Sequence, residues 1–207
     1  MTAYRDFIKD FPSRCYDILK NMDKWSKFCD REVTLSISIA CSGFVIPFDR
    51  LNPDAHVPHP SNDRNTYINA SKKIDELMGT NFIGSELHQS TTTKWKFGKV
   101  NKKNIKMFPE RIDSFKPKPI SNEKTTRSIL KIIRNSLAHG NIYTKGNPIE
   151  LLIFLTGRYD NAWNLIKYEF VSMPPYEFVN FLTLWFEFLK ENKLSIHKNI
   201  SRPSNAA

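Results

Sequence analysis

Apolar residues recur at steps of three and four along several segments of this chain, which is the spacing of an amphipathic helix. The pattern predicts four helical segments, over residues 6–28, 64–78, 122–139 and 176–190. Pro12 can divide the first segment, and Pro174-Pro175 opens the last one. Gly79 and Gly140 end the second and third segments, because glycine readily adopts the left-handed conformation that closes a helix.

Residues 30–50 carry an ambiguous pattern. The alternation of a half-buried strand runs through Val33, Leu35, Ile37 and Ile39. Asp30 before Glu32 could instead open a helix. Periodicity alone favours the strand.

The remaining segments are a hairpin and connections. Two β-prone runs, 149–156 and 163–173, flank the turn residues 157–161 and predict a β-hairpin. Residues 51–63 read as a proline-rich surface loop, and residues 80–120 as a long, basic, loop-rich connection, which is often functional. We expect one domain over residues 1–199 and a disordered tail over 200–207.

The net charge points to a polyanionic partner. Thirty-one Lys and Arg residues against 21 Asp and Glu residues leave a formal charge of +10, which fits nucleic acid best. A membrane surface would also attract this charge, but the N-terminal residues do not resemble a secretory leader and no apolar run approaches a spanning length. We therefore expect a cytoplasmic protein without a membrane partner.

The cysteines and histidines predict no metal site and no cofactor. Cys15, Cys29 and Cys41 are odd in number and lack close pairing, so we expect reduced, mostly buried thiols. A metal site at His56 and His59, with Asp54 and Asp63 nearby, is conceivable, but no established ligand spacing supports it.

Two lysine-rich stretches lie in the 80–120 connection. Positive charge alternates with aromatic rings there, a combination that suits phosphate contacts and base stacking. The RNA-binding candidates in these stretches are Lys94, Trp95, Lys96, Lys102 and Lys103. The alternative is a solvated basic loop that Trp95 and Phe97 pin to the core.

The predicted helix over 122–139 carries the candidate chemistry. Its apolar residues, including Ile129, Ile133 and Leu137, gather on one side and must face the core. The outward sector holds Lys124, Arg127, Lys131, Asn135 and His139. Lys124, Arg127 and Lys131 are therefore candidates for RNA contacts. Arg134 lies at the edge of that sector, where its planar, permanently charged fork matches a phosphate, and histidine can exchange a proton near neutral pH.

Arg134 and His139 are five residues apart, which separates them by about 140° around the helix axis. One helix therefore does not aim both at one atom, whereas two copies packed about a two-fold axis could, with Ile132 as a dimer contact. Asn135 lies one turn before His139 and could hydrogen-bond its ring. The alternative is that Arg134 pairs with a carboxylate and His139 is a last-turn histidine favoured by the helix dipole.

The run Arg134-Asn135-x-x-x-His139, placed late in an amphipathic helix, resembles the signature of the HEPN superfamily, the higher eukaryotes and prokaryotes nucleotide-binding domains. Residues 30–35, 43–48 and 149–154 are similar to a plasmid- and mobile-element-borne bacterial branch of that group. The resemblance covers residues 5 to 195.

The resemblance implies a mainly α fold, a HEPN-like helical bundle with a β-hairpin added between the signature helix and the C-terminal helix. It implies a core helix over residues 30–50, which overrides the strand interpretation. It also implies a homodimer in which the signature helices meet. Arg134 and His139 would be the catalytic pair, and Asn135 the polar residue that orients them.

The function that the resemblance implies is metal-independent RNA cleavage through the ribose 2′-hydroxyl. Such a protein would be a toxin or defence effector of a bacterial mobile element, with a nucleotidyltransferase-like antitoxin as a candidate partner. The alternative function is a catalytically inactive RNA- or nucleotide-binding module that acts as a scaffold.

Overall fold

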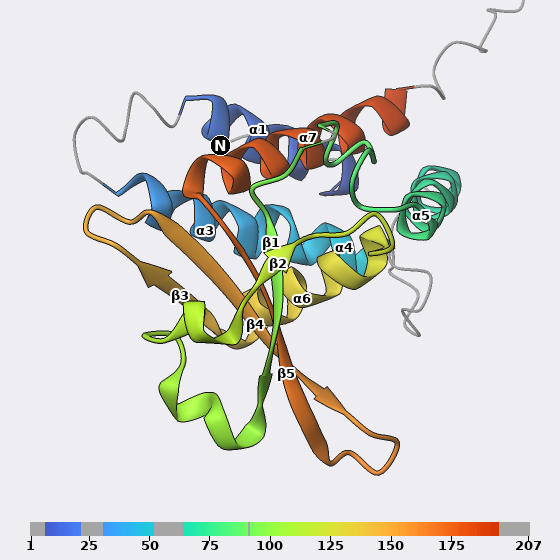
Figure 1. Cartoon of the computed structure of the whole chain (residues 1–207). Helices are drawn as coiled ribbons and strands as arrows, with labels where there is room; N and C mark the ends of the chain where they lie inside the picture. Colours follow the sequence, from blue (N-terminus) through green and yellow to red (C-terminus); the bar gives the residue numbers. More distant parts are fainter. Residues whose placement is uncertain (1–6, 22–30, 52–63, 91, 195–207) are drawn as a thin grey trace, which may run out of the picture.

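The computed structural model describes residues 7–21, 31–51, 64–90 and 92–194. Helices and an antiparallel sheet form two layers, with the helices on one face of the sheet (Figure 1). The helices are α1 (Phe7–Lys20), α3 (Glu32–Gly43), α4 (Val45–Leu51), α5 (Arg64–Gly79), α6 (Thr126–His139) and α7 (Pro175–Leu194). Two short 3-10 helices, η1 (Lys102–Met107) and η2 (Ile112–Phe115), lie in the connection between β1 and β2.

The sheet has five strands in the order β2-β1-β5-β4-β3. The strands are β1 (Lys96–Asn101), β2 (Lys118–Pro119), β3 (Ile142–Lys145), β4 (Leu151–Tyr159) and β5 (Leu165–Met173). All neighbouring pairs are antiparallel. The predicted hairpin is therefore confirmed as β4 and β5, but it is only the centre of a larger sheet.

The expected mainly α bundle is therefore wrong, because β1 and β3 extend the hairpin on both sides. β1 was not predicted because its sequence lacks the signal of a strand. Its lysines are exposed, and Gly98 and Val100 are the two residues of the strand that are buried. Gly98 lies opposite Phe170, and a Cβ atom at Gly98 would come within 2.2 Å of the Phe170 ring. This glycine therefore permits a close approach to the ring rather than marking a loop.

Residues 32–43 form a helix rather than the strand that their alternation favours. α3 packs against α1, α6 and α7, so apolar side chains on several sides of it are covered. Its serines return hydrogen bonds to the backbone one turn earlier, as Ser38 does to the Thr34 carbonyl at 2.9 Å. A helix that is apolar on several sides no longer shows the helical period.

The stretch Glu32–Leu51 is long and apolar enough to cross a membrane by length and composition alone. This finding corrects the expectation that no apolar run approaches a spanning length. In the structure α3 and α4 meet at Phe44, which is fully buried, as are Phe48 and Leu51. The stretch contacts α1, α5, α6 and α7 and is thus a core helix here.

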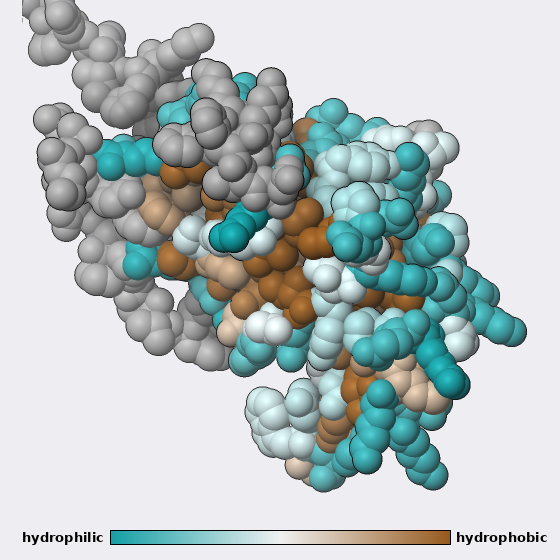
Figure 2. Space-filling view, turned by 90° about the vertical axis from the view of Figure 1, so that its left-hand side faces the viewer, coloured by the Kyte–Doolittle hydropathy of each residue, from teal (hydrophilic) through white to brown (hydrophobic). Residues whose placement is uncertain are grey.

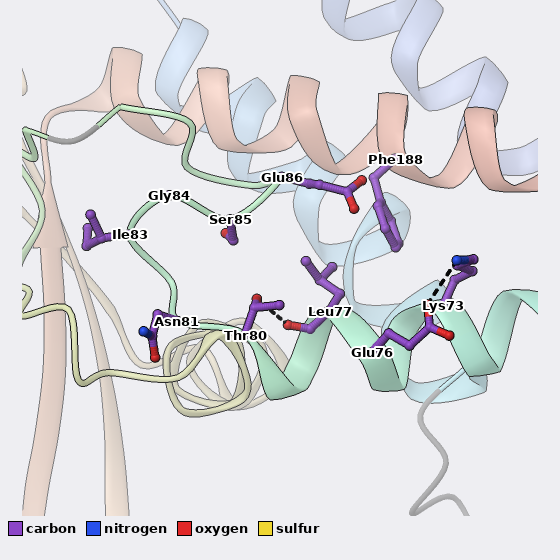
Figure 3. Close-up of a pocket in the computed structure, with 10 residues that line it drawn as sticks. All are labelled: Lys73, Glu76, Leu77, Thr80, Asn81, Ile83, Gly84, Ser85, Glu86 and Phe188. Carbon is purple, nitrogen blue, oxygen red and sulfur yellow. Dashed lines mark hydrogen bonds and ion pairs between the residues drawn. The ribbon is translucent and has the colours of Figure 1, made fainter.

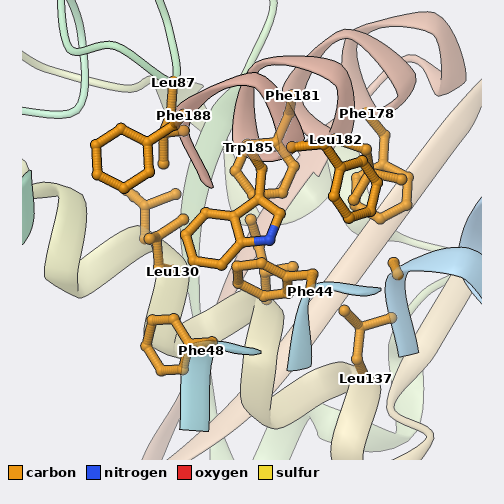
Figure 4. Close-up of a cluster of buried hydrophobic side chains, with 14 of the residues drawn as sticks. Phe44, Phe48, Leu87, Leu130, Leu137, Phe178, Phe181, Leu182, Trp185 and Phe188 are labelled. Atoms are coloured by element: carbon orange, nitrogen blue, oxygen red, sulfur yellow. The ribbon is translucent and has the colours of Figure 1, made fainter. Parts of the chain in front are cut away.

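The main core lies between α7, α6 and α3–α4 (Figure 4). Trp185 of α7 is its centre: the ring is fully buried, lies edge-on to Phe44 at 5.0 Å between centroids, and donates Nε1–H to the Gly43 carbonyl at 3.1 Å. A second cluster on the opposite face of the sheet includes Phe108, Ile153 and Phe170 and is covered by the η1–η2 segment. Apolar side chains also reach the surface on the face shown in Figure 2, where hydrophilic side chains border them.

The thiols of Cys15 and Cys41 differ in accessibility, and Cys29 lies outside the described residues. Cys15 is 5% exposed, and burial raises its pKa to about 11, whereas Cys41 is exposed. Burial also raises the pKa of Cys41. Because the thiolate is the reactive species and only Cys41 of the two is exposed, we expect a Cys29→Ser variant to react with Ellman's reagent at pH 8 faster at Cys41 than at Cys15, which should react only after unfolding. Equal labelling rates for the two thiols in the native protein would contradict this packing.

Candidate functional site

The site is built on α6, whose two ends are fixed by local sequence. The Thr125 hydroxyl caps the first turn by accepting the backbone N–H of Ser128, so the helix begins four residues later than predicted. Lys124 therefore precedes the helix instead of lying on its face. Gly140 ends the helix with φ +68°, as predicted from the sequence.

Arg134 is held by a carboxylate from α4. Its Nε and Nη2 donate to the two carboxylate oxygens of Asp49 at 2.7 and 2.6 Å, and Nη1 donates to the Asn135 carbonyl oxygen at 3.0 Å. The hydrogen bond to Asp49 raises the pKa of Arg134. These bonds use three of the five N–H donors of the guanidinium, and the side chain is 31% exposed, so two donors remain to contact an anion.

Asn135 links the arginine to the sheet. Its oxygen accepts from Arg134, and its amide nitrogen lies 3.5 Å from the Thr156 hydroxyl of β4. The predicted hydrogen bond from Asn135 to the His139 ring is therefore wrong, because both ends of the carboxamide face other groups. Asn135 positions Arg134 rather than the imidazole.

His139 lies in the last turn of α6, one residue before the cap. Its side chain is exposed and makes no hydrogen bond within the part of the chain that the structure describes. The imidazole is thus accessible at the surface, while Arg134 on the same helix is fixed toward α4. Ile132, predicted as a dimer contact, is instead 3% exposed and belongs to the core of the monomer.

The other basic residues predicted on this helix face have different neighbours in the structure. Arg127 donates to Asp75 of α5 at 2.9 Å, and Lys131 is exposed. The Lys124 ammonium lies 4.0 Å from the centre of the Phe97 ring in β1. The three basic residues therefore lie beside different elements, Lys124 at β1 and Arg127 at α5, and of the three only Lys131 is fully at the surface.

Lys94, Trp95 and Lys96 precede or begin β1, and Lys102 and Lys103 follow its other end. Trp95 is 1% exposed, packs against Phe82 at 4.9 Å, and directs Nε1 toward Glu177 at 3.3 Å. Its prediction as a base-stacking residue is wrong because the core encloses the ring. The lysines of both stretches are exposed, but β1 separates the two groups.

A protein-family model described as HEPN pEK499 p136 matches residues 1–195. The chain belongs to the HEPN pEK499 p136 family. This match confirms the resemblance to the HEPN superfamily and to its plasmid-associated branch. No curated protein and no solved structure matches this HEPN protein.

Other constellations in the HEPN protein offer no competing site. Histidine, cysteine and carboxylate side chains form no metal-binding group among the described residues, and the His56–His59 stretch lies outside them. Ser136 is buried and donates to the Ile132 and Leu155 carbonyls, so it is a packing residue. A polar pocket of about 370 Å³ lies between α5, residues 80–86 and α7 (Figure 3). Its Lys73 pairs with Glu76 at 2.9 Å, and Thr80 donates to the Leu77 carbonyl.

Two residues that position the site, Asp49 and Thr156, were not predicted from the sequence of this HEPN protein. Asp49 is 85 residues from Arg134 along the chain, and Thr156 lies inside a β-prone run. The available signal was an acidic residue, next to Arg50, in a helical stretch whose other residues are apolar, which often marks a buried or half-buried ion pair. Spacing alone does not identify its partner.

Proposed function

We propose that this HEPN protein is a metal-independent endoribonuclease that acts as a homodimer. The observation that carries the proposal is the Arg134-Asn135-x-x-x-His139 run within a family match that spans residues 1–195. Two features of the site support it: Arg134 is oriented with donors to spare, and the His139 imidazole is accessible.

The residue types are sufficient for the reaction. An imidazole removes the proton of the ribose 2′-hydroxyl, the 2′-oxygen attacks phosphorus, and the bond to the 5′-oxygen breaks as that oxygen takes up a proton. Arg134 would stabilise the charge that develops on the phosphorane. The products would be a 2′,3′-cyclic phosphate and a 5′-hydroxyl end, and DNA, which lacks the 2′-hydroxyl, would survive.

The proposed homodimer would bring together two groups that are separated within one chain. Arg134 is directed toward α4 by Asp49, whereas His139 lies exposed in the last turn of α6. A second chain related by a two-fold axis would bring the His139 of one copy to the Arg134 of the other. Each composite site would then draw on both chains.

A plasmid-associated family suggests a role in a mobile element. We propose a toxin or defence effector that acts in the bacterial cytoplasm and is restrained by a nucleotidyltransferase-like antitoxin encoded beside it. Induced expression should then arrest growth, and His139→Ala should relieve the arrest. Equal arrest by the variant at the same protein level would contradict a nuclease toxin.

The direct test is incubation of the purified protein with RNA and with single-stranded DNA of the same sequence, in the presence of EDTA. We expect cleavage of RNA only, with cyclic phosphate ends, and loss of cleavage in Arg134→Ala and His139→Ala. Circular dichroism and sedimentation would establish that both variants remain folded and keep the oligomeric state. RNA that stays intact with the folded wild-type protein would overturn the proposal.

The second candidate function is an inactive RNA- or nucleotide-binding module. The ion pair between Asp49 and Arg134 favours it, because a carboxylate already neutralises the arginine. A binding module would bind RNA without cutting it, and His139→Ala would change its affinity only modestly. The cleavage assay and an RNA-binding assay on the same preparations separate the two functions.

The role of Asp49 can be tested on its own. Asp49→Ala removes two hydrogen bonds that orient Arg134, so we expect kcat for RNA cleavage to fall about tenfold with little change in KM. Asp49→Glu should recover part of the rate. In an Arg134→Ala background, Asp49→Ala should have no further effect.

Asp75→Ala is the matched control, since it breaks the other Arg–Asp pair of α6. That pair is exposed, and its loss should leave kcat within about twofold. Equal losses in Asp49→Ala and Asp75→Ala would indicate a general effect on α6 instead of a positioning role.

A further inference from the structure

The end of the β4–β5 hairpin extends past the helices (Figure 1). Thr156 of β4 contacts Asn135 of α6, and β4 continues beyond that point to Tyr159. The burial of both strands falls off in the same direction, from the fully buried Phe154 to the exposed Arg158 and Tyr159. β1 pairs with β5 as far as Lys167, so the hairpin is part of a three-stranded region at the candidate site and becomes a two-stranded ribbon only beyond the Arg158–Lys167 row.

Cations lie on the face of this hairpin that continues from Asn135. Thr156 is paired with Glu169 of β5, and Glu169 with Lys99 of β1; in the next row Arg158 is paired with Lys167. Directly paired residues and residues two positions apart share a face of a sheet. Lys99, Arg158 and Lys167 therefore lie on the face where Asn135 contacts Thr156.

One buried carboxylate fixes the positions of two of these cations. Glu169 is 8% exposed and lies 3.0 Å from Arg158 Nε and 3.8 Å from Lys167 Nζ. The side chains of Arg158 and Lys167 are 57% and 35% exposed, so their charged ends still reach solvent. Arg158 and Lys167 thus share the Glu169 carboxylate, and with Lys99 of the neighbouring strand they form a row of positive charge beside the candidate site.

Two exposed aromatic rings, Tyr159 and Trp163, lie at the turn end of the hairpin. Tyr159 lies over Gly157, because a Cβ atom at Gly157 would meet the Tyr159 ring at 2.9 Å. Tyr159 is therefore on the face opposite Arg158, and the Trp163 ring lies 6.4 Å from it, with 83% of Trp163 exposed.

The turn holds Trp163 in an unusual conformation. Its φ is +61°, which bulky residues rarely adopt, and it persists because the turn is tied together around Asp160. The Asp160 carboxylate accepts the backbone N–H groups of Ala162 and Asn164 at 2.9 and 2.8 Å. Because the exposed indole adds no buried apolar surface to the core, a strained turn that presents it to solvent points to a binding role for the ring.

We propose that the end of the β4–β5 hairpin binds an unpaired segment of RNA, with Arg158, Lys167 and Lys99 on its phosphates and Tyr159 and Trp163 stacked on its bases. Rings with free faces and fixed cations are the combination that binds single strands. Because the hairpin is two-stranded beyond Lys167, a flexible single strand can bend around its end and use both faces, whereas a stiff duplex cannot, and the bases of a duplex are already stacked. The inference rests on the proposed ribonuclease function only in naming this RNA as the substrate.

The test measures binding with the full-length His139→Ala protein, which should leave RNA intact. The probes are a fluorescent, unstructured oligoribonucleotide and the same strand in a perfect duplex. Tyr159→Ala combined with Trp163→Ala should weaken binding of the single strand by about thirtyfold or more and leave binding of the duplex unchanged. Arg158→Gln combined with Lys167→Gln should weaken binding of the single strand and lower the slope of log affinity against log salt by about two.

Matched controls lie elsewhere on the surface. Tyr176→Ala removes an exposed ring from α7, and Lys73→Gln removes an exposed cation from α5. Both should bind the single strand as the parent does. A thermal midpoint like that of the parent would show that the hairpin variants are folded, and Trp163→Phe, which keeps a ring, should retain most of the affinity.

The outcomes separate this inference from the proposed function. Wild-type cleavage together with hairpin variants that bind and cleave normally would overturn the inference and leave the ribonuclease function standing. Hairpin-dependent binding of single strands without wild-type cleavage would retain the RNA site and overturn the ribonuclease function. Unchanged RNA binding with a hairpin-dependent affinity for polyglutamate would assign the surface to an acidic protein partner and overturn the inference.

Discussion

His139→Ala is expected to slow RNA cleavage by about a hundredfold to ten-thousandfold, which is what one general acid or base usually contributes. The side chain is exposed and makes no hydrogen bond within the described residues, so its removal should leave the free energy of unfolding nearly unchanged. Single-turnover cleavage rates at saturating protein would measure the effect. A loss below about threefold in a folded variant would exclude His139 from the proton-transfer step.

The same variant tests the composite dimer site. His139→Ala and Arg134→Ala proteins, each inactive alone, should regain about a quarter of wild-type activity when unfolded and refolded together in equal amounts. Half of the dimers formed would be mixed, and one of the two sites in each mixed dimer would hold both intact groups. A mixture that stays inactive although subunits exchange would contradict the composite site. Arg134 and His139 would then act within one chain, or activity would require both copies of each residue in the dimer.

The second large effect is expected on stability. Trp185→Ala should lower the free energy of unfolding by about 3–5 kcal/mol, because it leaves a cavity at the centre of the core and an unpaired Gly43 carbonyl. Trp185→Phe, which keeps a ring but not the hydrogen bond, should lose about 1–3 kcal/mol. Urea unfolding followed by far-ultraviolet circular dichroism would measure both.

Trp163→Ala is the matched control for the stability measurement, since it removes an indole that is 83% exposed. Its effect should stay within about 0.5 kcal/mol. If the two tryptophan variants were equally stable, the packing of α7 against α3 and α4 would be different from that described.

The sequence predicted the elements whose signals are local. The Gly140 cap, the end of α5 at Gly79 and the existence of the β4–β5 hairpin all depend on residues close to one another in the chain, although the turn lies at residues 160–164 and not at the predicted 157–161. The same holds for the signature run on α6. These features needed no knowledge of tertiary contacts.

The elements that the sequence missed depend on partners far away. β1 becomes a strand because β5 offers it a pairing edge and Phe170 covers Gly98. Periodicity favoured a strand for α3 and only the family resemblance implied a helix there, because neighbouring helices cover its apolar sides. The sequence left open whether Trp95 stacks on a base or pins its loop to the core, and its contacts with Phe82 and Glu177 place it in the core. The contact between Asp49 and Arg134 depends on the packing of α4 on α6, which the spacing of residues in the sequence does not predict.

The two outer strands of the sheet restrict how copies of this protein can associate. β2 has only two residues, one of them a proline that cannot donate a backbone hydrogen bond, and β3 has four. Short edges of this kind discourage strand addition and sheet-to-sheet aggregation between molecules. The edges of the sheet are therefore poor surfaces for self-association of this basic protein.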